Sequence, residues 1–498
     1  MAPWTATVTA VAVAVAVGIT CGITGVAVPP SAAGGLPAHV PTTGPSVQSP
    51  LIGAYYSDWF PANATQGTLR QHLVPAQGAD PTRVDSADPR VAERAIAQAT
   101  QSGIDFFALD WWPSRPAQNE NVDAFLRADN LRDIKFCILY ETWDLGFAAG
   151  SESTPVTPWM EVAFDLNLVS FAHQYFGNPS YLRIHGRPVV VLYLSRTLTG
   201  DVAGMIDGAR SVLEARGIDP FFIGDEISWR VTSPDEAPGT LALTRTPPVS
   251  RIDLFDAITA YTLYAGGPPD PLTPEQDFDT YPGDTDLVPD EVALYRTYAL
   301  ATGGRVPVVP DVMPGINTRG VRLQVGQHAQ PRQWLPGAPS GSTLDHYLRQ
   351  IAWPVLEPSL PMVLVTSWNE WNEDTAVQPV GGVPTDRDDS PTGTEYTQGY
   401  TYGGEGSADL RVIRNVADVA WGRVVDSAGR PAPHVRVVET AGGRPVDGVR
   451  TDSEGWYVLP RSGRCPSPRT VEVAGAGSVI ARTFVCSAGR ASLEDLRT

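Results

Sequence analysis

Short apolar runs alternate with amphipathic stretches between residues 51 and 375. The apolar runs lie at residues 51–59, 104–112, 135–140, 188–194, 220–224, 257–261, 306–312 and 361–368. Near-continuous apolar runs of this length are typical of strands in a parallel sheet that helices cover on both faces. The pattern therefore predicts a series of buried parallel strands.

The stretches between these runs have helical periodicity. They lie at residues 88–103, 119–131, 201–217, 290–304 and 342–357. Three of them end in glycine and one opens with Ser342-Thr343, which are common helix caps. Strands with helices between them predict an α/β fold of the (β/α)8, or TIM-barrel, type. An open doubly wound sheet is the alternative, but no G-x-G-x-x-G turn follows any of the strands.

The pattern changes near residue 418 to short alternating runs separated by turns. It predicts a small all-β sandwich of the immunoglobulin or transthyretin type at residues 419–498, after a barrel domain at residues 51–416. The motif G-x-V-x-D-x-x-G-x-P at residues 422–431 and a later T-D-x-x-G-x-Y motif resemble the carboxypeptidase-regulatory-like domain. That resemblance implies an accessory module without chemistry of its own.

The N-terminal region differs from the rest of the chain because its first 57 residues contain no Lys, Arg, Asp or Glu. Residues 8–28 are almost wholly apolar, and small residues follow them, so residues 1–33 are predicted to be an export signal. A stretch of about 20 apolar residues is also long enough to remain in the bilayer as an anchor, so both alternatives stay open. Residues 34–50 have the composition of a linker. Either way we expect a protein that is secreted or anchored to the outer face of the cell membrane.

Charge and motifs exclude several classes of function. The chain has 36 Lys and Arg against 55 Asp and Glu, a net charge of −19, which argues against nucleic acid or an anionic membrane surface as a partner. Lys135 is the sole lysine and lies in no phosphate-binding loop, and the histidines show no zinc-site spacing. We therefore expect no metal or organic cofactor. Among the cysteines, Cys137 is predicted to be buried, and Cys465 and Cys486 to form a disulfide of an exported module.

Carboxylates and aromatic side chains follow the ends of the predicted strands, where barrels carry their reactive groups. The residues expected to bind substrate there are Tyr55, Tyr56, Asp58, Asp110, Trp111, Trp112, Glu141, Tyr193, Glu226, Tyr261, Asn317, Trp368 and Asn369. Aromatic rings stack on sugar rings, and carboxylates bind hydroxyls and move protons, so the pattern favours a carbohydrate site. Trp111 and Trp112 point in opposite directions on a strand, so at most one of them is expected to face the cleft.

Glu370 and Glu373 are the strongest candidates for catalysis. They follow the eighth predicted strand, three residues apart, between tryptophans. If the chain turns helically there, their Cβ atoms are about 5–6 Å apart. Two carboxylates that close can divide the work, one ionised and the other holding its proton.

The segment S-W-N-E-W-N-E-D-T-A-V-Q-P at residues 367–379 resembles the N-E-W-H-E-G-T-x-I-E-P signature of glycoside hydrolase family 99, the endo-α-mannosidase and endo-α-mannanase group. GAYYSDWF at the first predicted strand and PGINTRGVR after the seventh add to a resemblance over residues 51–415. It implies retaining hydrolysis of an α-mannosidic bond through a 1,2-anhydro sugar. Glu370 would then take the proton of the substrate 2-hydroxyl, and Glu373 would act as general acid and base.

The same resemblance implies that Glu141 lines the site and that Tyr261 contacts sugar. The sequence departs from the family signature at four positions: Asn372 replaces histidine, Asp374 glycine, Val377 isoleucine and Gln378 glutamate. Both glutamates are kept, so the resemblance implies the same mechanism as a hypothesis, whereas the sugar and the linkage do not follow from it.

We therefore expect an exported glycoside hydrolase that cleaves an α-mannoside-containing glycan. Three alternatives remain. The barrel could hydrolyse another polysaccharide with a conventional pair such as Glu226 and Glu370, whose separation would be about 5–5.5 Å or 6.5–9.5 Å. It could bind glycans without cleaving them. It could also act in polysaccharide assembly, although the predicted export and the lack of a nucleotide-binding motif argue against that.

Overall fold

The structure is a computed structural model. It describes residues 50–60, 73–75, 84–146, 154–228, 249–263, 281–317, 329–357, 359–371, 373–382, 406–416, 419–426, 430–441, 444–451, 455–460, 469–474, 480–484 and 496–497. The predicted export segment or anchor, the linker up to residue 49 and the predicted Cys465–Cys486 disulfide lie outside these ranges. Cys137 is buried and free, as expected.

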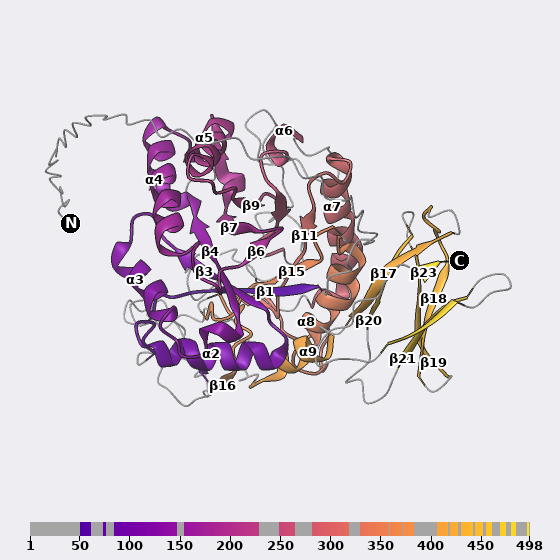
Figure 1. The fold of residues 1–498 in the computed structure, drawn as a ribbon. Coiled ribbons are helices and arrows are strands. Elements are labelled where there is room, and N and C mark those ends of the chain that lie inside the picture. Colours follow the sequence, from indigo (N-terminus) through magenta and orange to yellow (C-terminus); the bar gives the residue numbers. More distant parts are fainter. Residues whose placement is uncertain are drawn as a thin grey trace, which may run out of the picture. The chain divides into compact units, whose positions relative to one another are not determined.

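The centre of the fold is a parallel barrel, which confirms the predicted α/β barrel (Figure 1). Its strands are β1 (Leu51–Tyr56), β3 (Phe106–Trp111), β4 (Lys135–Glu141), β7 (Arg187–Tyr193), β9 (Phe221–Asp225), β10 (Ala257–Thr259), β11 (Val308–Val309), β12 (Asp311–Val312) and β15 (Met362–Val365). They pair in the order β11-β10-β9-β7-β4-β3-β1-β15-β12. All eight predicted strands are found, with ends shifted by a few residues.

The barrel closes through a strand that proline divides. β11 pairs with β10, and β12 pairs with β15, and Pro310 alone separates the two halves. Proline has no N–H to donate to a ladder, so the predicted strand at residues 306–312 is interrupted there. The carbonyl of Pro310 still accepts from the N–H of Leu364 at 3.0 Å, which ties this strand to β15.

Helices surround the barrel strands (Figure 1). They are α2 (Pro89–Ser102), α3 (Pro116–Phe125), α4 (Pro158–Gln174), α5 (Val202–Glu214), α6 (Val249–Ile252), α7 (Leu287–Ala301), α8 (Ser342–His346) and α9 (Ala408–Val416). Helix α2 shows why the predicted limits hold: Asp88 accepts from the Arg90 N–H at its start, and Gly103 ends it with φ 87°. Glycine adopts that left-handed conformation without strain.

The helix expected at residues 342–357 is broken into three parts. After α8 the chain continues as a π-helical segment, η8 (Tyr347–Ala352), and a 3₁₀ turn, η9 (Trp353–Val355). Pro354 lies in the last part, and its missing N–H and its ring are incompatible with a continuing α-helix.

Side chains of the strands alternate between the barrel interior and the helix layer. Tyr55 on β1 meets Tyr261 across the barrel, whereas its neighbour Tyr56 packs against Phe125 of α3. The same alternation places Trp111 outside, stacked on Tyr140 of β4. One apolar core therefore joins the barrel strands to the helices around them.

The described strands beyond residue 418 form two sheets. One contains β17 (Val419–Val425), β20 (Trp456–Pro460) and β23 (Leu496–Arg497); the other contains β18 (Arg436–Ala441), β19 (Arg444–Arg450), β21 (Arg469–Ala474) and β22 (Ile480–Phe484). Val424 and Tyr457 of the first sheet share a small core with Val437 and Val473 of the second. The likeness of this region to a carboxypeptidase-regulatory-like domain stays a prediction.

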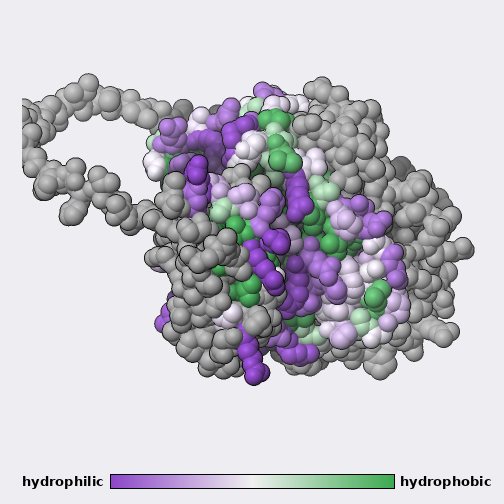
Figure 2. Space-filling view, turned by 90° about the vertical axis from the view of Figure 1, so that its right-hand side faces the viewer, coloured by the Kyte–Doolittle hydropathy of each residue, from purple (hydrophilic) through white to green (hydrophobic). Residues whose placement is uncertain are grey.

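Shorter strands decorate the barrel. They are β2 (Leu73–Pro75), β5 (Thr154–Pro155), β6 (Arg183–Ile184), β8 (Leu198–Thr199), β13 (Ile316–Asn317), β14 (Ala329–Gln330) and β16 (Val380–Gly382). On the face that Figure 2 displays, hydrophobic residues lie in small groups among hydrophilic ones. No helix in the described ranges combines the length and the apolar composition needed to cross a bilayer.

Gly53 is expected to be essential for the packing of the barrel interior. A Cβ atom at this position would lie 2.1 Å from Cζ of Phe106, which is fully buried on the neighbouring strand. We expect Gly53→Ala to lower the free energy of unfolding by about 1–3 kcal/mol or more, measured by urea denaturation. Gly177→Ala is the matched control, because nothing lies within 4 Å of its added Cβ. Equal stability of the two variants would contradict this packing.

Candidate functional site

Three tyrosines meet at the carboxyl ends of the barrel strands. Tyr55 lies on β1, Tyr193 ends β7 and Tyr261 follows β10. The ring centroid of Tyr261 lies 5.1 Å from that of Tyr55 and 4.7 Å from that of Tyr193. Tyr55 is buried beneath the other two, which are half-buried. Tyr193 and Tyr261 therefore present ring surface at the rim, where they were predicted to lie.

Three glutamates surround this tyrosine pair. Burial is the main cause that raises the pKa of Tyr261, and the charges of Tyr193, Glu373, Glu370 and Glu141 raise it further. The pKa of Tyr193 is raised by burial and then by Glu141 and Glu373. Such interactions weaken with distance, so Glu141 and Glu373 lie near both tyrosines and Glu370 lies near Tyr261.

Glu370 and Glu373 lie on a turn, not on a helix. The Thr375 N–H donates to the Glu370 carbonyl at 3.2 Å, and the Glu370 N–H donates to Oγ of Ser367 at 2.8 Å. Oγ of Ser367 also lies 3.0 Å from the Thr375 hydroxyl. Glu370 is 4% exposed and Glu373 is half-buried, so the two carboxylates have different access to water.

A buried arginine holds this turn. Arg332 donates to Oδ1 of Asp374 at 3.0 Å and to the carbonyls of Asp374 and Ala376, each at 2.9 Å. A further N–H of the guanidinium reaches Asp409 of α9 at 2.9 Å. Asp374 has φ 56°, a left-handed conformation that favours glycine. Asp374 thus adopts a backbone conformation that glycine adopts without strain, and it forms an ion pair with Arg332.

Two of the other departures from the family signature are also part of the scaffold. Val377 and Gln378 are both buried. The Val377 N–H donates to the carbonyl of Ser367 at 2.9 Å, and the Gln378 N–H donates to the carbonyl of Trp368 at 2.8 Å. Asn372 lies outside the described residues.

A row of buried carboxyls leads from β1 to the glutamates. Burial raises the pKa of Asp110 to about 7, and the neighbouring Glu141 and Trp112 partly offset this rise. Nε1 of Trp112 donates to Oδ2 of Asp110 at 2.8 Å. Burial and the charge of Asp110 raise the pKa of Asp58 well above its usual range. Asp58, Asp110 and Glu141 lie together, as predicted, and Trp112 positions this row.

The carboxylates after β9 are occupied by arginines. Asp225 pairs with Arg196 and accepts from the N–H groups of Leu194 and Tyr261. Glu226 forms a two-point ion pair with Arg251, at 3.1 and 3.0 Å. These contacts give both acids a role in holding the loops after β9.

Several predicted substrate ligands instead hold the fold together. Tyr56 packs against Phe125, and the rings of Trp111 and Trp368 lie in the packing between the strands and the helices. Asn369 uses both ends of its amide on the main chain of Ser57, at 2.7 Å each. These contacts give the four residues a part in the packing, and their role as substrate ligands stays a prediction. The side chain of Asn317 lies outside the described part of the structure.

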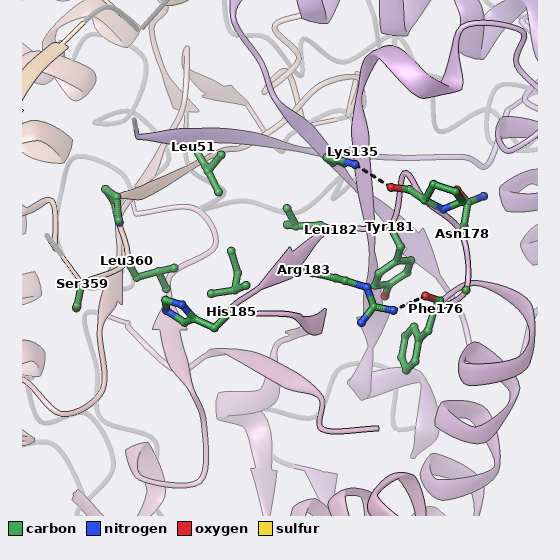
Figure 3. Close-up of a pocket in the computed structure, with 14 residues that line it drawn as sticks. Leu51, Lys135, Phe176, Asn178, Tyr181, Leu182, Arg183, His185, Ser359 and Leu360 are labelled. Carbon is green, nitrogen blue, oxygen red and sulfur yellow. Dashed lines mark hydrogen bonds between the residues drawn. The ribbon is translucent and has the colours of Figure 1, made fainter. Parts of the chain in front are cut away.

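A cavity of about 570 Å³ lies at the opposite end of the barrel. Figure 3 shows Leu51, Lys135 and Arg183 among the side chains that line it. Its lining comes from the amino-terminal ends of β1 and β4 and contains no Asp or Glu. The chemistry predicted for this chain therefore does not belong to it. Within the described ranges, no three His, Cys, Asp or Glu side chains are grouped to hold a metal ion.

Comparisons with known proteins agree with the fold. A family model described as Glycosyltransferase WbsX matches residues 50–260. An uncharacterized protein WxcX of Xanthomonas campestris pv. campestris is 23% identical over 341 residues, which is 66% of this chain and 44% of the relative. The chain thus spans less than half the length of the curated relatives that it matches.

Among solved structures, a glycoside hydrolase-like protein is 18% identical with a TM-score of 0.51, covering 75% of this chain and 96% of that one. This similarity confirms the barrel fold. The GH99 endo-α-mannosidase of Bacteroides thetaiotaomicron is 16% identical with a TM-score of 0.48, covering 73% of this chain and 95% of that one.

Arg332 is expected to stabilise the turn that carries the two glutamates. Arg332→Met leaves Asp374 and Asp409 buried without their cation, which should cost about 3–5 kcal/mol of unfolding free energy, measured by denaturant titration. Asp374→Gly should cost far less, because glycine accepts the left-handed backbone. The double variant should recover part of the loss. A loss below about 1 kcal/mol in Arg332→Met would show that the ion pairs do not hold the turn.

Asp110 should make folding stability fall as pH rises. A folded-state pKa of about 7 exceeds the unfolded value, so the unfolded chain gains stability by losing a proton between about pH 4 and pH 7. Asp110→Asn imitates the protonated carboxyl. The free energy of unfolding of this variant should match that of the parent protein near pH 4. At pH 8 it should exceed the parent value by at most about 4 kcal/mol, with a correspondingly higher melting temperature.

Asp88→Asn is the control, because the carboxyl of Asp88 should give stability the opposite pH dependence. The hydrogen bond from Arg90 lowers the pKa of Asp88, so its carboxylate stabilises the fold above the unfolded pKa and loses this effect as pH falls. A pH-independent difference between Asp110→Asn and the parent protein would contradict the shifted pKa.

Proposed function

We propose that the protein is a retaining glycoside hydrolase that cleaves α-mannosidic bonds of a neutral glycan. The observation that carries the proposal is that Glu141, Glu370 and Glu373 follow strand ends at the same rim as the half-buried Tyr193 and Tyr261, with all three glutamates acting on Tyr261. Carboxylates of unequal burial beside aromatic rings can move protons and bind a sugar at the same place.

The buried Glu370 serves as the base for the sugar's 2-hydroxyl, and the more exposed Glu373 serves as acid and base. Glu370 takes the 2-hydroxyl proton, the freed oxygen bonds to C1, and the bond from C1 to the leaving oxygen breaks as Glu373 protonates that oxygen. Water then attacks C1 of the 1,2-anhydro sugar and gives a proton to Glu373. Oxygen 2 recovers its proton from Glu370, so both glutamates return to their starting states.

This route favours α-mannosides because the 2-hydroxyl must lie trans to the departing bond. An α-glucoside has its 2-hydroxyl on the other side of the ring and cannot react in this way. The chain's net charge of −19 and the row of acids at the rim favour a neutral glycan over a phosphorylated or uronic one.

A conventional pair of Glu226 and Glu370 is a weaker alternative. The two-point ion pair with Arg251 occupies both oxygens of Glu226. Glu226 would have to break that pair before it could act as a nucleophile or proton donor, which costs several kcal/mol for a buried pair.

Sugar transfer is the second candidate, and the description of the matching family model as a glycosyltransferase favours it. A sugar diphosphate donor would bring further negative charge to a rim of carboxylates, while Arg196 and Arg251 are already paired with Asp225 and Glu226. If a glycan were the sugar donor, an acceptor sugar could replace water in the second step, and no sugar diphosphate would be needed. Export, and a membrane anchor at residues 8–28, remain proposals that rest on the sequence.

Hydrolysis of yeast-type α-mannan by the whole chain tests the proposal. We expect Glu373→Gln to release oligosaccharides about 10²–10⁴-fold more slowly, because it removes the general acid. An aryl α-mannoside chain has a leaving group that needs no proton. On this substrate, Glu373→Gln should again release the aryl group in the first step of the first turnover. Glu370→Gln should stay inactive on both substrates.

A substrate lacking the 2-hydroxyl of the reacting sugar distinguishes the mechanisms. It should not be cleaved by the proposed route, whereas a conventional nucleophile would still cleave it. Binding of mannan without release of any product would instead support a glycan-binding protein. Incorporation of sugar from a nucleotide donor, with no hydrolysis, would support the transferase.

A further inference from the structure

A second cavity, of about 470 Å³, lies at the same end of the barrel as the glutamates. Trp59 and Phe60 line it from the segment after β1, and Arg115, Gln118 and Asn121 line it from the start of α3. The proposed catalytic step does not use this cavity, and two of its lining side chains, Gln118 and Asn121, donate to Asp58 at 3.4 and 2.6 Å.

The cavity borders the candidate site on two sides. The ring of Trp59 lies 6.1 Å from that of Trp112, which donates to Asp110 in the row that ends at Glu141. The ring of Phe60 lies 4.4 Å from that of Trp371, the residue that follows Glu370 in the catalytic turn. A ligand in the cavity would therefore lie next to both the row of buried carboxyls and the turn that carries Glu370 and Glu373.

The lining has the chemistry of a sugar-binding surface. Trp59 is half-buried, and Nε1 of its ring has no hydrogen-bond acceptor within the described part of the chain. The guanidinium of Arg115 is exposed and stacks 3.8 Å from the ring centroid of Trp112, which fixes it in place. An aromatic face together with an exposed guanidinium donor can bind the apolar face and the hydroxyls of a sugar.

We propose that this cavity is a distal subsite that holds a neutral sugar residue of the same glycan chain, away from the bond that is cleaved. The proposal rests on the proposed function, because it assigns a second binding position to that substrate. It implies that the protein acts on chains longer than a disaccharide.

Binding to an inactive full-length chain tests the subsite. In the Glu373→Gln protein, calorimetry should show affinity that rises from an α-mannose disaccharide to a hexasaccharide. Adding Trp59→Ala should remove this rise and weaken hexasaccharide binding about tenfold, whereas Trp59→Phe should restore much of it because it keeps an aromatic face. Trp159→Ala is the matched control, since Trp159 lies on α4 outside the cavity and is 70% exposed.

The outcomes separate the two proposals. Equal affinity for all chain lengths, or an equal effect of Trp59→Ala on all of them, would overturn the subsite and leave the hydrolase standing. The same loss in Trp159→Ala would also overturn it. If the inactive protein binds no α-mannose oligosaccharide and the active protein cleaves none, the proposed function fails and the subsite fails with it.

Discussion

Everything at the candidate site depends on the parallel pairing of the first and last barrel strands. β1 and β15 are joined along their length, and two further contacts extend the seam beyond them. The Trp368 N–H donates to the Tyr55 carbonyl at 2.7 Å, and the amide of Asn369 binds both polar groups of the Ser57 main chain. These contacts bring residues more than 300 positions apart into one rim. Without this closure, Tyr55 and the Glu370–Glu373 turn would have no common neighbour.

Burial gives the site its electrostatic character. Carboxyls removed from water favour the protonated form unless a cation or hydrogen-bond donors compensate. Arginines pair with Asp225, Glu226 and Asp374, whereas Asp58 and Asp110 form no ion pair in the described part of the structure, and burial raises the pKa of both. The first group holds loops, and the second favours the protonated form. Acids that look alike in the sequence thus have different physical roles.

The residues of the candidate site and the residues of the second cavity come from different elements. The glutamates and tyrosines are held by strand ends and by the clamp of Arg332, so their positions follow from the barrel. The second cavity lies between the segment after β1 and the start of α3, next to the same strand ends. Barrels commonly place chemistry on strand ends and selectivity on the loops beyond them. Here the ring contacts of Trp59 with Trp112 and of Phe60 with Trp371 join the second cavity to the strand ends that carry the acids.

The sequence by itself determined the barrel, because buried parallel strands and amphipathic helices leave periodic signatures that do not depend on distant contacts. It also indicated Glu370 and Glu373 as the pair to consider, since they follow directly on an apolar strand. Only the tertiary structure showed which of the candidate residues pack against the helices. Trp111 and Trp368 look like sugar-binding residues in the sequence, but the alternation of side chains turns them toward the helix layer.

No motif marks Arg332 either, because its partners Asp374 and Asp409 lie 42 and 77 residues away in the chain. Local patterns record which face of an element is apolar. The partners of a buried charge are set by how the elements pack, and no local pattern contains that information.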